Sequence, residues 1–180
     1  MAQYNYSCKV EENMAKAVGR HLPISRKTAV EICNYLRGKP VERAKAILNN
    51  VIAMKEPIPY RVYTWGIGHK RKMGSGRYPV KASKYILEVI ESVVANAQMK
   101  GLATGKLEIC HISAQPGPII MHRGRQGRRR MKQAHIEVVV RESKEEKKDT
   151  KTFAQKKAAK AEAKVAESKV ETKTQEAKKA

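Results

Sequence analysis

The chain reads Leu107-Glu108-Ile109-Cys110-His111-Ile112 shortly after Gly105, a β-branched run that predicts a strand. A second run, His135-Ile136-Glu137-Val138-Val139-Val140, places Ile136, Val138 and Val140 on one face of another strand. Residues 119–133 separate the two runs, and an antiparallel hairpin with a long tip is the simplest connection. Because two strands alone form a marginal sheet, we expect a further strand near residues 14–18.

Apolar residues at helical spacing predict three helices before this hairpin. The first follows Ser25, a suitable N-cap, and ends at Gly38. The second begins near Pro40 and is expected to end at the prolines 57 and 59, and the third spans about residues 81–100. The residues expected to face the core are Ala29, Ile32, Cys33 and Leu36 in the first helix, Ala44, Ile47, Leu48, Val51 and Ile52 in the second, and Ala82, Ile86, Val89, Ile90, Val93 and Ala97 in the third.

The composition changes near Arg141, where a tail rich in Lys, Ala and Glu begins. Its only large apolar residues are Phe153, Val165 and Val170, which bury too little surface to offset the entropy of ordering the tail. We therefore expect a folded domain over residues 1–141 and a tail over 142–180 that is disordered or partly helical. The predicted fold class is α+β: three helices packed on a small antiparallel sheet, with a protruding hairpin at about 107–140 and a low-complexity tail.

The charge of the chain indicates a polyanionic partner. Lys and Arg number 38 against 17 Asp and Glu, for a net charge of +21, which repels itself in a compact protein and argues against an ordinary enzyme. Nucleic acid is the usual polyanion that neutralises such a charge. There is no run of 18 apolar residues, so no membrane span is expected. The three distant cysteines, Cys8, Cys33 and Cys110, indicate free thiols in a reducing compartment.

The tip of the predicted hairpin, residues 121–132, is the most cationic segment. Six of these twelve residues are Lys or Arg and none is acidic, and closely spaced guanidinium groups repel one another unless an anion lies between them. We expect RNA contacts from His122, Arg123, Arg125, Arg128, Arg129, Arg130 and Lys132.

A second candidate is the long polar segment after the second helix, residues 60–78, where aromatic residues alternate with cations. This combination suits base stacking together with phosphate neutralisation. Each ring of the segment either stacks on a base or covers the core, and the sequence leaves both alternatives open. The candidate RNA-binding residues are Arg61, Tyr63, Trp65, His69, Lys70, Arg71, Lys72 and Arg77.

A third cationic group precedes and opens the first helix. Two of its members, Arg26 and Lys27, lie in the first helical turn, where the helix dipole disfavours cations. A bound anion would remove this conflict. The candidate residues of this group are Lys16, Arg20, His21, Arg26 and Lys27.

Other kinds of site fit the sequence poorly. Gly66-Ile67-Gly68 lacks the third glycine of the dinucleotide fingerprint, because Arg71 stands there. The chain has no Cys-x-x-Cys pair and its five histidines are scattered, so we expect no zinc site. Because the nucleotide-binding patterns fail as well, we expect no cofactor. His111 and His135 flank the hairpin and are expected to face each other. A satisfied pair of sheet histidines is the favoured interpretation, and a nuclease that uses both is the alternative.

Several motifs, in order along the chain, resemble the universal large-subunit ribosomal protein of the twenty-second family, in its archaeal and eukaryotic branch. They are Ile24-Ser25-Arg26-Lys27, Arg37-Gly38-Lys39-Pro40-Val41-Glu42-Arg43-Ala44, Leu48-Asn49-Asn50-Val51-Ile52-Ala53, Gly76-Arg77-Tyr78-Pro79-Val80-Lys81, Asn96-Ala97-Gln98-Met99-Lys100-Gly101-Leu102 and His135-Ile136-Glu137. The resemblance covers about residues 3–141.

The resemblance implies a structural protein of cytoplasmic ribosomes and not an enzyme. Its implied partners are large-subunit rRNA, neighbouring large-subunit ribosomal proteins and the nascent peptide, because the family's hairpin lines the peptide exit tunnel. At the tip, His122 stands where the family usually has proline, and the span from Gly117 to His135 is several residues shorter than usual. The alternative is a chromatin-like or nucleoid-like protein that coats nucleic acid through charge alone.

Overall fold

The computed structural model describes residues 4–143 of the 180-residue chain. The predicted tail over 142–180 therefore lies almost entirely outside the described residues. Within them, no helix is both long and apolar enough to cross a membrane.

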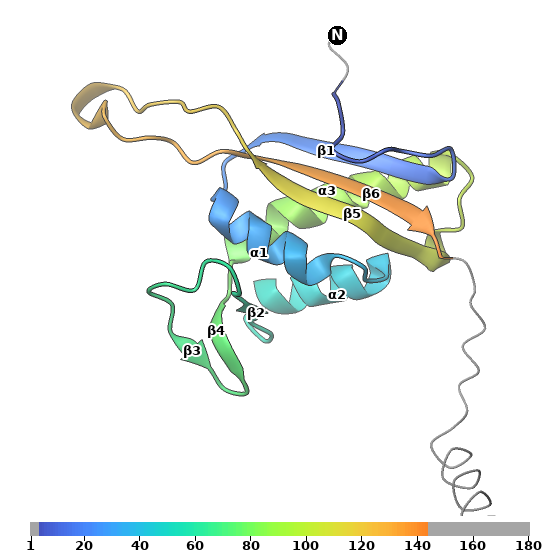
Figure 1. Cartoon of the computed structure of the whole chain (residues 1–180), viewed down its shortest axis with the longest axis horizontal. Helices are drawn as coiled ribbons and strands as arrows, with labels where there is room; N and C mark the ends of the chain where they lie inside the picture. Colours follow the sequence, from blue (N-terminus) through green and yellow to red (C-terminus); the bar gives the residue numbers. More distant parts are fainter. Residues whose placement is uncertain (1–3, 144–180) are drawn as a thin grey trace, which may run out of the picture. The chain divides into compact units, whose positions relative to one another are not determined.

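The core is built on a three-stranded antiparallel sheet, as expected. Its strands are β1 (Met14–Leu22), β5 (Leu107–Pro116) and β6 (Ala134–Glu142), in the order β1-β6-β5 (Figure 1). The pair β5 and β6 forms the predicted hairpin, with Leu107 opposite Glu142 and Pro116 opposite Ala134. The strand expected near residues 14–18 is longer than predicted, because it pairs with β6 as far as Leu22.

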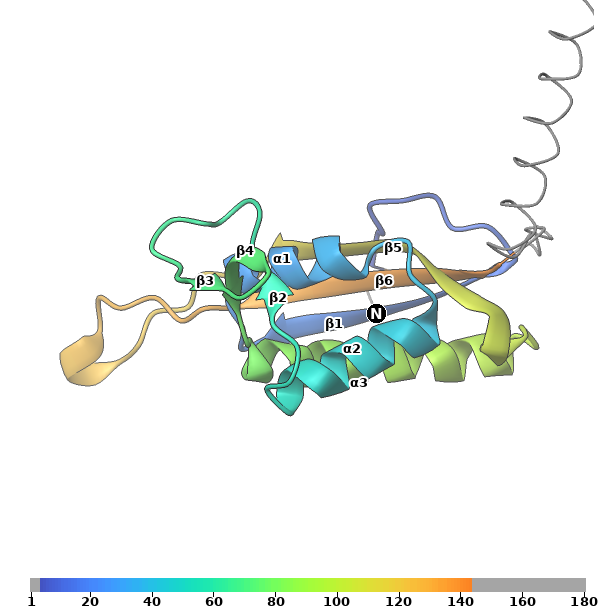
Figure 2. The same ribbon diagram turned by 90° about the horizontal axis from the view of Figure 1, so that it is seen from below.

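Three helices cover one face of this sheet, which confirms the predicted α+β class. They are α1 (Arg26–Leu36), α2 (Val41–Ile52) and α3 (Val80–Met99). Helix α1 packs on β5, α3 packs on β1 and β6, and α2 packs on α3 (Figure 2). Short 3-10 turns occupy Thr104–Lys106 and Gly124–Gln126. All the predicted core-facing residues are buried except Ile52, which is half-buried.

The end of α2 differs from the prediction. The helix stops at Ile52, several residues before Pro57, and Met54 then adopts a left-handed conformation with φ of 56°. The amide of Lys55 donates to the carbonyl of Asn50, so the chain turns back on the last helical turn before either proline is reached.

The segment over 57–79, which the sequence indicated only as a long polar loop, contains a second sheet. Its strands are β2 (Ile58–Pro59), β3 (His69–Lys70) and β4 (Met73–Arg77), in the order β2-β4-β3. We call residues 57–79 the insertion. Ile58 is fully buried and anchors the insertion to the main core.

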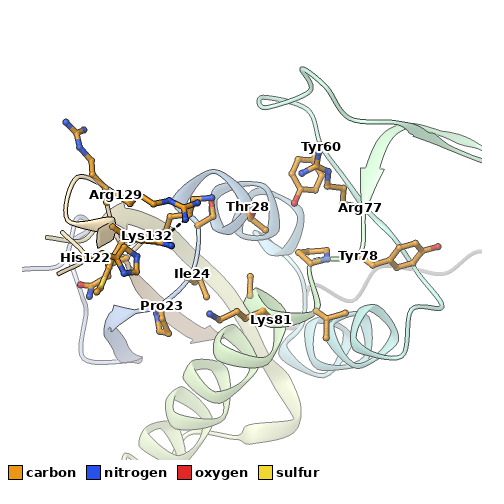
Figure 3. A pocket seen from close by; sticks show the side chains of 18 residues that line it. Pro23, Ile24, Thr28, Tyr60, Arg77, Tyr78, Lys81, His122, Arg129 and Lys132 are labelled. Carbon is orange, nitrogen blue, oxygen red and sulfur yellow. Dashed lines mark hydrogen bonds between the residues drawn. The ribbon is translucent and has the colours of Figure 1, made fainter. Parts of the chain in front are cut away.

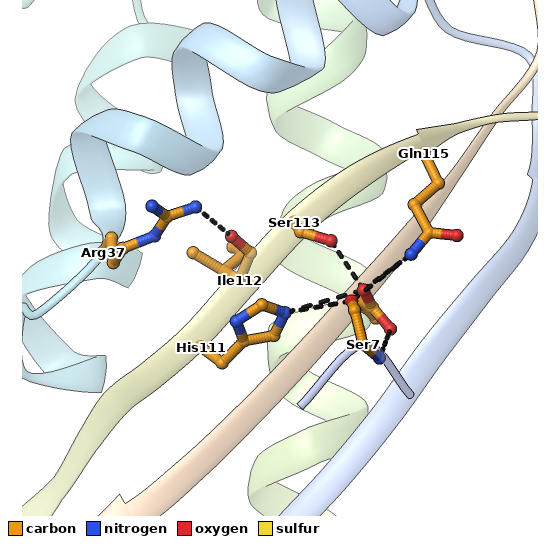
Figure 4. Close-up of polar contacts among 7 residues, drawn as sticks. Ser7, Arg37, His111, Ile112, Ser113 and Gln115 are labelled. Carbon is orange, nitrogen blue, oxygen red and sulfur yellow. Dashed lines mark hydrogen bonds and ion pairs between the residues drawn. The ribbon is translucent and has the colours of Figure 1, made fainter. Parts of the chain in front are cut away.

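A buried carboxylate lies on the face of the main sheet that is opposite the helices. Glu137 alternates with the core residues Ile136 and Val138, so its side chain points away from the helices. It accepts hydrogen bonds from Ser113 Oγ at 2.6 Å and Gln115 Nε2 at 2.9 Å. The backbone amide of Ser7 donates to the same carboxylate at 3.1 Å (Figure 4). The carboxylate therefore ties the N-terminal segment to the sheet.

Candidate nucleic-acid interface

The hairpin continues beyond its paired strands as an arm over residues 117–133, which we call the arm. Cross-strand hydrogen bonds join its two sides, from the Met131 amide to the Ile120 carbonyl at 2.7 Å and from the His122 amide to the Arg129 carbonyl at 2.9 Å. Gly124 takes a φ of 68° where the chain reverses, a conformation that favours glycine. Figure 1 shows the arm projecting beyond the helices and the sheet.

The side chains of the arm tip are exposed and almost unpaired. All seven predicted contact residues of the tip, His122, Arg123, Arg125, Arg128, Arg129, Arg130 and Lys132, are exposed. Within the described part of the chain, the only hydrogen bond from their side chains runs from Arg129 Nη1 to Gln126 Oε1 at 2.7 Å. Among residues 4–143, no carboxylate forms an ion pair with this cluster, so its charge is available to an external anion.

The aromatic rings of the insertion differ in exposure. Tyr60 is 6% exposed and covers the core, whereas Trp65 is 99% exposed and has its indole in solvent. Tyr63 and Tyr78 are half-buried and lie beneath cations, with Lys27 Nζ 5.6 Å and Lys70 Nζ 5.4 Å from the ring centres. Tyr60 is thus a core residue, and Trp65 is the ring best placed for stacking on a base.

The predicted cations of the insertion are also exposed: Arg61, His69, Lys70, Arg71, Lys72 and Arg77. Most of them lie on or next to the short strands β3 and β4. The guanidinium group of Arg77 donates to the Gly66 carbonyl at 3.3 Å, which links β4 to the Trp65 turn.

A buried carboxylate from α1 holds the start of the insertion. Glu31 is 1% exposed and accepts hydrogen bonds from three consecutive backbone amides. The distances are 3.0 Å from Arg61 to Oε2, and 2.9 Å and 2.6 Å from Val62 and Tyr63 to Oε1. A charged acceptor makes these bonds stronger than neutral ones, so Glu31 positions Arg61 and Tyr63 without contacting a ligand itself.

Replacing Glu31 with glutamine should loosen the insertion, because one acceptor oxygen becomes a donor that faces backbone donors. We expect the free energy of unfolding to fall by about 1–3 kcal/mol. Hydrogen exchange measured by NMR should accelerate at the amides of residues 61–63. The matched control is Glu91→Gln, at an exposed site in α3, which should change neither quantity. Wild-type exchange rates at residues 61–63 in the variant would contradict this role for Glu31.

The N-terminal candidates lie on β1 and α1. Lys16 and Arg20 stack over Tyr6 and Tyr4, at 5.1 Å and 5.0 Å from the ring centres. Sequence reasoning did not single out these two rings. Arg26 and Lys27 occupy the first turn of α1, as expected, and this turn contains no acidic residue.

The histidines of the hairpin do not face each other, contrary to the expectation. In the register, His111 lies opposite Val139 and His135 lies opposite Gln115. His111 Nε2 lies 3.5 Å from Glu137 Oε1, whereas His135 stacks on His21 at 4.8 Å and accepts from the His21 amide at 3.1 Å. Burial, assisted by the charges of His21 and Arg20, lowers the pKa of His135. Each histidine thus has its own structural partner.

The three cysteines are free, as predicted. Burial raises the pKa of the Cys33 thiol to about 12, so it behaves as an apolar core group. Among residues 4–143, no group of three or more His, Cys, Asp or Glu side chains is arranged to hold a metal ion.

The structure brings one predicted residue of the insertion, Arg77, to the same groove as part of the arm. Arg77 of the insertion and His122, Arg129, Arg130 and Lys132 of the arm line one groove, together with Lys81 at the start of α3. Lys16 and Arg20 lie outside this groove, beside the N-terminal tyrosines. Lys81 was not among the predicted contact residues, and its position four residues after Arg77 was the only sign in the sequence that it belongs to this surface.

Residues 17–141 match the protein family described as "Ribosomal protein L22p/L17e". The chain belongs to this family. It is 43% identical over 150 residues to "Large ribosomal subunit protein uL22" of Staphylothermus marinus, an alignment that covers 77% of this chain and 96% of the relative. The protein of the same name from Archaeoglobus fulgidus is 45% identical over 125 residues, covering 67% and 81%. That of Methanococcus maripaludis strain C5 is 42% identical over 151 residues, covering 79% and 99%.

Membership of the L22p/L17e family makes this chain a structural protein of the large ribosomal subunit, located in cytoplasmic ribosomes. The resemblance seen in the sequence motifs is therefore confirmed. The alternative of a chromatin-like coat protein finds no support in these comparisons.

Proposed function

We propose that the protein binds large-subunit rRNA and inserts its arm between rRNA segments, so that the tip contributes to the wall of the nascent-peptide exit tunnel. The observation that carries this proposal is the arm itself. It projects from the sheet, carries five arginines and contains no acidic residue. An arm of this charge is held in place when RNA phosphates surround it on several sides.

Apolar residues near the tip support the contact with the nascent peptide. Ile119, Ile120 and Met121 are 67%, 44% and 52% exposed, although they belong to the least polar part of the arm. Such residues offer a growing peptide an uncharged surface beside the arginines. The span from Gly117 to His135, which is shorter than usual in the family, and His122 at the tip set how far this surface extends into the tunnel.

The domain over 1–141 acts in this proposal as a structural rRNA-binding unit, with the insertion and β1 as further contacts and neighbouring ribosomal proteins beside it. It performs no catalysis. A nuclease that uses His111 and His135 is disfavoured, because the two rings have separate partners, Glu137 and His21.

Co-sedimentation tests the proposal directly. The tagged full-length protein should sediment with large subunits, and RNase treatment should release it. Crosslinks from residues 119–133 should map to rRNA and to a stalled nascent peptide. Sedimentation that survives complete RNA digestion would contradict rRNA binding.

Binding to rRNA should depend strongly on salt, because each neutralised phosphate releases condensed counterions. If about six phosphates are engaged, a plot of log affinity against log salt concentration should have a slope of roughly −4 to −5. Filter binding of a large-subunit rRNA transcript at several salt concentrations measures this slope. A value near −1 would show that charge does not drive the interaction.

A further inference from the structure

A groove of about 900 Å³ separates the helices from the arm. On the helical side it is lined by the first turns of α1 and α3 and by the end of β4, and on the other side by residues of the arm. Figure 3 shows Arg77 and Lys81 on the side of the helices, and His122, Arg129 and Lys132 on the side of the arm.

The lining of the groove is cationic on both sides. It includes Arg77, Lys81, Arg129, Arg130 and Lys132, and none of the lining residues is acidic. Within residues 4–143, the side chains of Lys81, Arg130 and Lys132 have no hydrogen-bonded or ion-paired partner. Cations held on opposite walls of one cavity raise its positive potential, which an anion between them would lower.

Two helix N-termini add to this potential. Neither α1 nor α3 has an acidic residue in its first turn, and neither receives a hydrogen bond from a capping side chain. By contrast, Glu42 occupies the first turn of α2, whose N-terminus does not line the groove. Ser25 and Lys81 bring the two uncapped ends to the same cavity, where free backbone amides favour an anion.

We propose that this groove binds a stretch of RNA phosphodiester backbone, clamped between Lys81 and Arg77 on one side and the arm on the other. The proposal rests on the rRNA binding proposed above and locates one of its contacts. An RNA backbone fits because it presents successive negative charges that can meet both walls, whereas a single free phosphate would meet one. The clamp would also fix the angle at which the arm leaves the domain.

Three variants, each of which lowers the net charge by one unit, test this proposal. Ser25→Asp places a carboxylate in the groove at the N-cap of α1, Lys81→Gln removes a cation of the wall, and Lys84→Gln removes a matched cation one turn further along α3, outside the groove. Aspartate is a favourable N-cap residue, so Ser25→Asp should leave the melting temperature unchanged or raised. Any loss of binding by this variant is therefore not a folding defect.

Affinity of the full-length variants is measured with a large-subunit rRNA transcript. We expect Ser25→Asp to bind about 10-fold more weakly, and Lys81→Gln to bind severalfold more weakly with a salt slope smaller by about 1. Lys84→Gln should bind within about 2-fold of wild type. Inorganic phosphate at millimolar concentration should not compete with the transcript.

The outcomes separate this proposal from the proposed function. If wild type binds the transcript and Ser25→Asp and Lys81→Gln bind no worse than Lys84→Gln, the groove is not an RNA contact, although rRNA binding stands. If inorganic phosphate displaces the transcript, the site takes free phosphate and not the backbone. If wild-type protein does not bind the transcript, both proposals are wrong.

Discussion

Replacing all five tip arginines with alanine should nearly abolish incorporation of the protein into large subunits while leaving its fold intact. The residues are Arg123, Arg125, Arg128, Arg129 and Arg130. All are exposed, and only Arg129 makes a side-chain hydrogen bond, to Gln126 on the same turn. Their removal relieves like-charge repulsion, so the free energy of unfolding should change by no more than about 1 kcal/mol. In the ribosome, each substitution would remove the charge-assisted hydrogen bonds that the arginine makes to phosphates.

Quantitative mass spectrometry of purified large subunits, from cells that express tagged wild-type or variant protein, measures incorporation. The control removes the same number of charges from positions outside the arm, the insertion and the groove: the exposed Lys9, Arg43, Lys55 and Lys84 and the half-buried Lys45. The control variant should still enter large subunits at nearly the wild-type level if incorporation depends on the position of the arginines and not on net charge alone. Wild-type incorporation of the five-alanine variant would show that the arm is not the principal RNA contact.

The main elements of the fold were predictable because each carries a periodic apolar pattern. Ile136, Val138 and Val140 alternate along β6, and the stripe of α3 repeats over five turns. Strand β1 was only partly predicted, because its buried residues are the small Ala15 and Ala17. Its full length follows from pairing with β6, a contact between segments more than a hundred residues apart.

The small sheet of the insertion was not predictable from local pattern. Strand β4 reads Met-Gly-Ser-Gly-Arg and has neither β-branched residues nor alternation. Tertiary contacts hold it instead. Ile58 on β2 is buried in the core, and Glu31 accepts hydrogen bonds from the backbone amides that follow β2. A glutamate in an amphipathic helix gives no sign, in sequence alone, that three distant backbone amides will surround it.

The candidate interface was predictable in composition but not in arrangement. Runs of Lys and Arg identify the arm and the insertion, because like charges accumulate where an anion binds. Which runs meet depends on the fold, which sets Arg77 and Lys81 across a groove from Lys132. The face-to-face arrangement of His111 and His135 was wrong for a related reason, because the pairing register of the hairpin puts Gln115 opposite His135 and Val139 opposite His111.

Replacing Ile47 with alanine should have the opposite consequence to the arm variant. Ile47 lies in α2, is 2% exposed and belongs to the main hydrophobic cluster. Its truncation removes buried apolar contacts and leaves a cavity, so the free energy of unfolding should fall by about 2–5 kcal/mol in urea denaturation. The affinity of the folded fraction for rRNA should stay at the wild-type value, because α2 does not line the groove and carries none of the proposed RNA contacts.

The matched control for this variant is Asn49→Ala, two residues along the same helix at an exposed position, which should change stability by less than about 0.5 kcal/mol. The two variants should then have separate effects. The five-alanine arm variant should weaken RNA binding without changing stability, and Ile47→Ala should lower stability without changing RNA binding. If Ile47→Ala lowered the affinity of the folded protein as strongly as the five-alanine arm variant, α2 would belong to the interface. The separation of the core from the RNA-facing surface would then be wrong, because a core truncation that leaves the molecule folded would have displaced the groups that contact RNA.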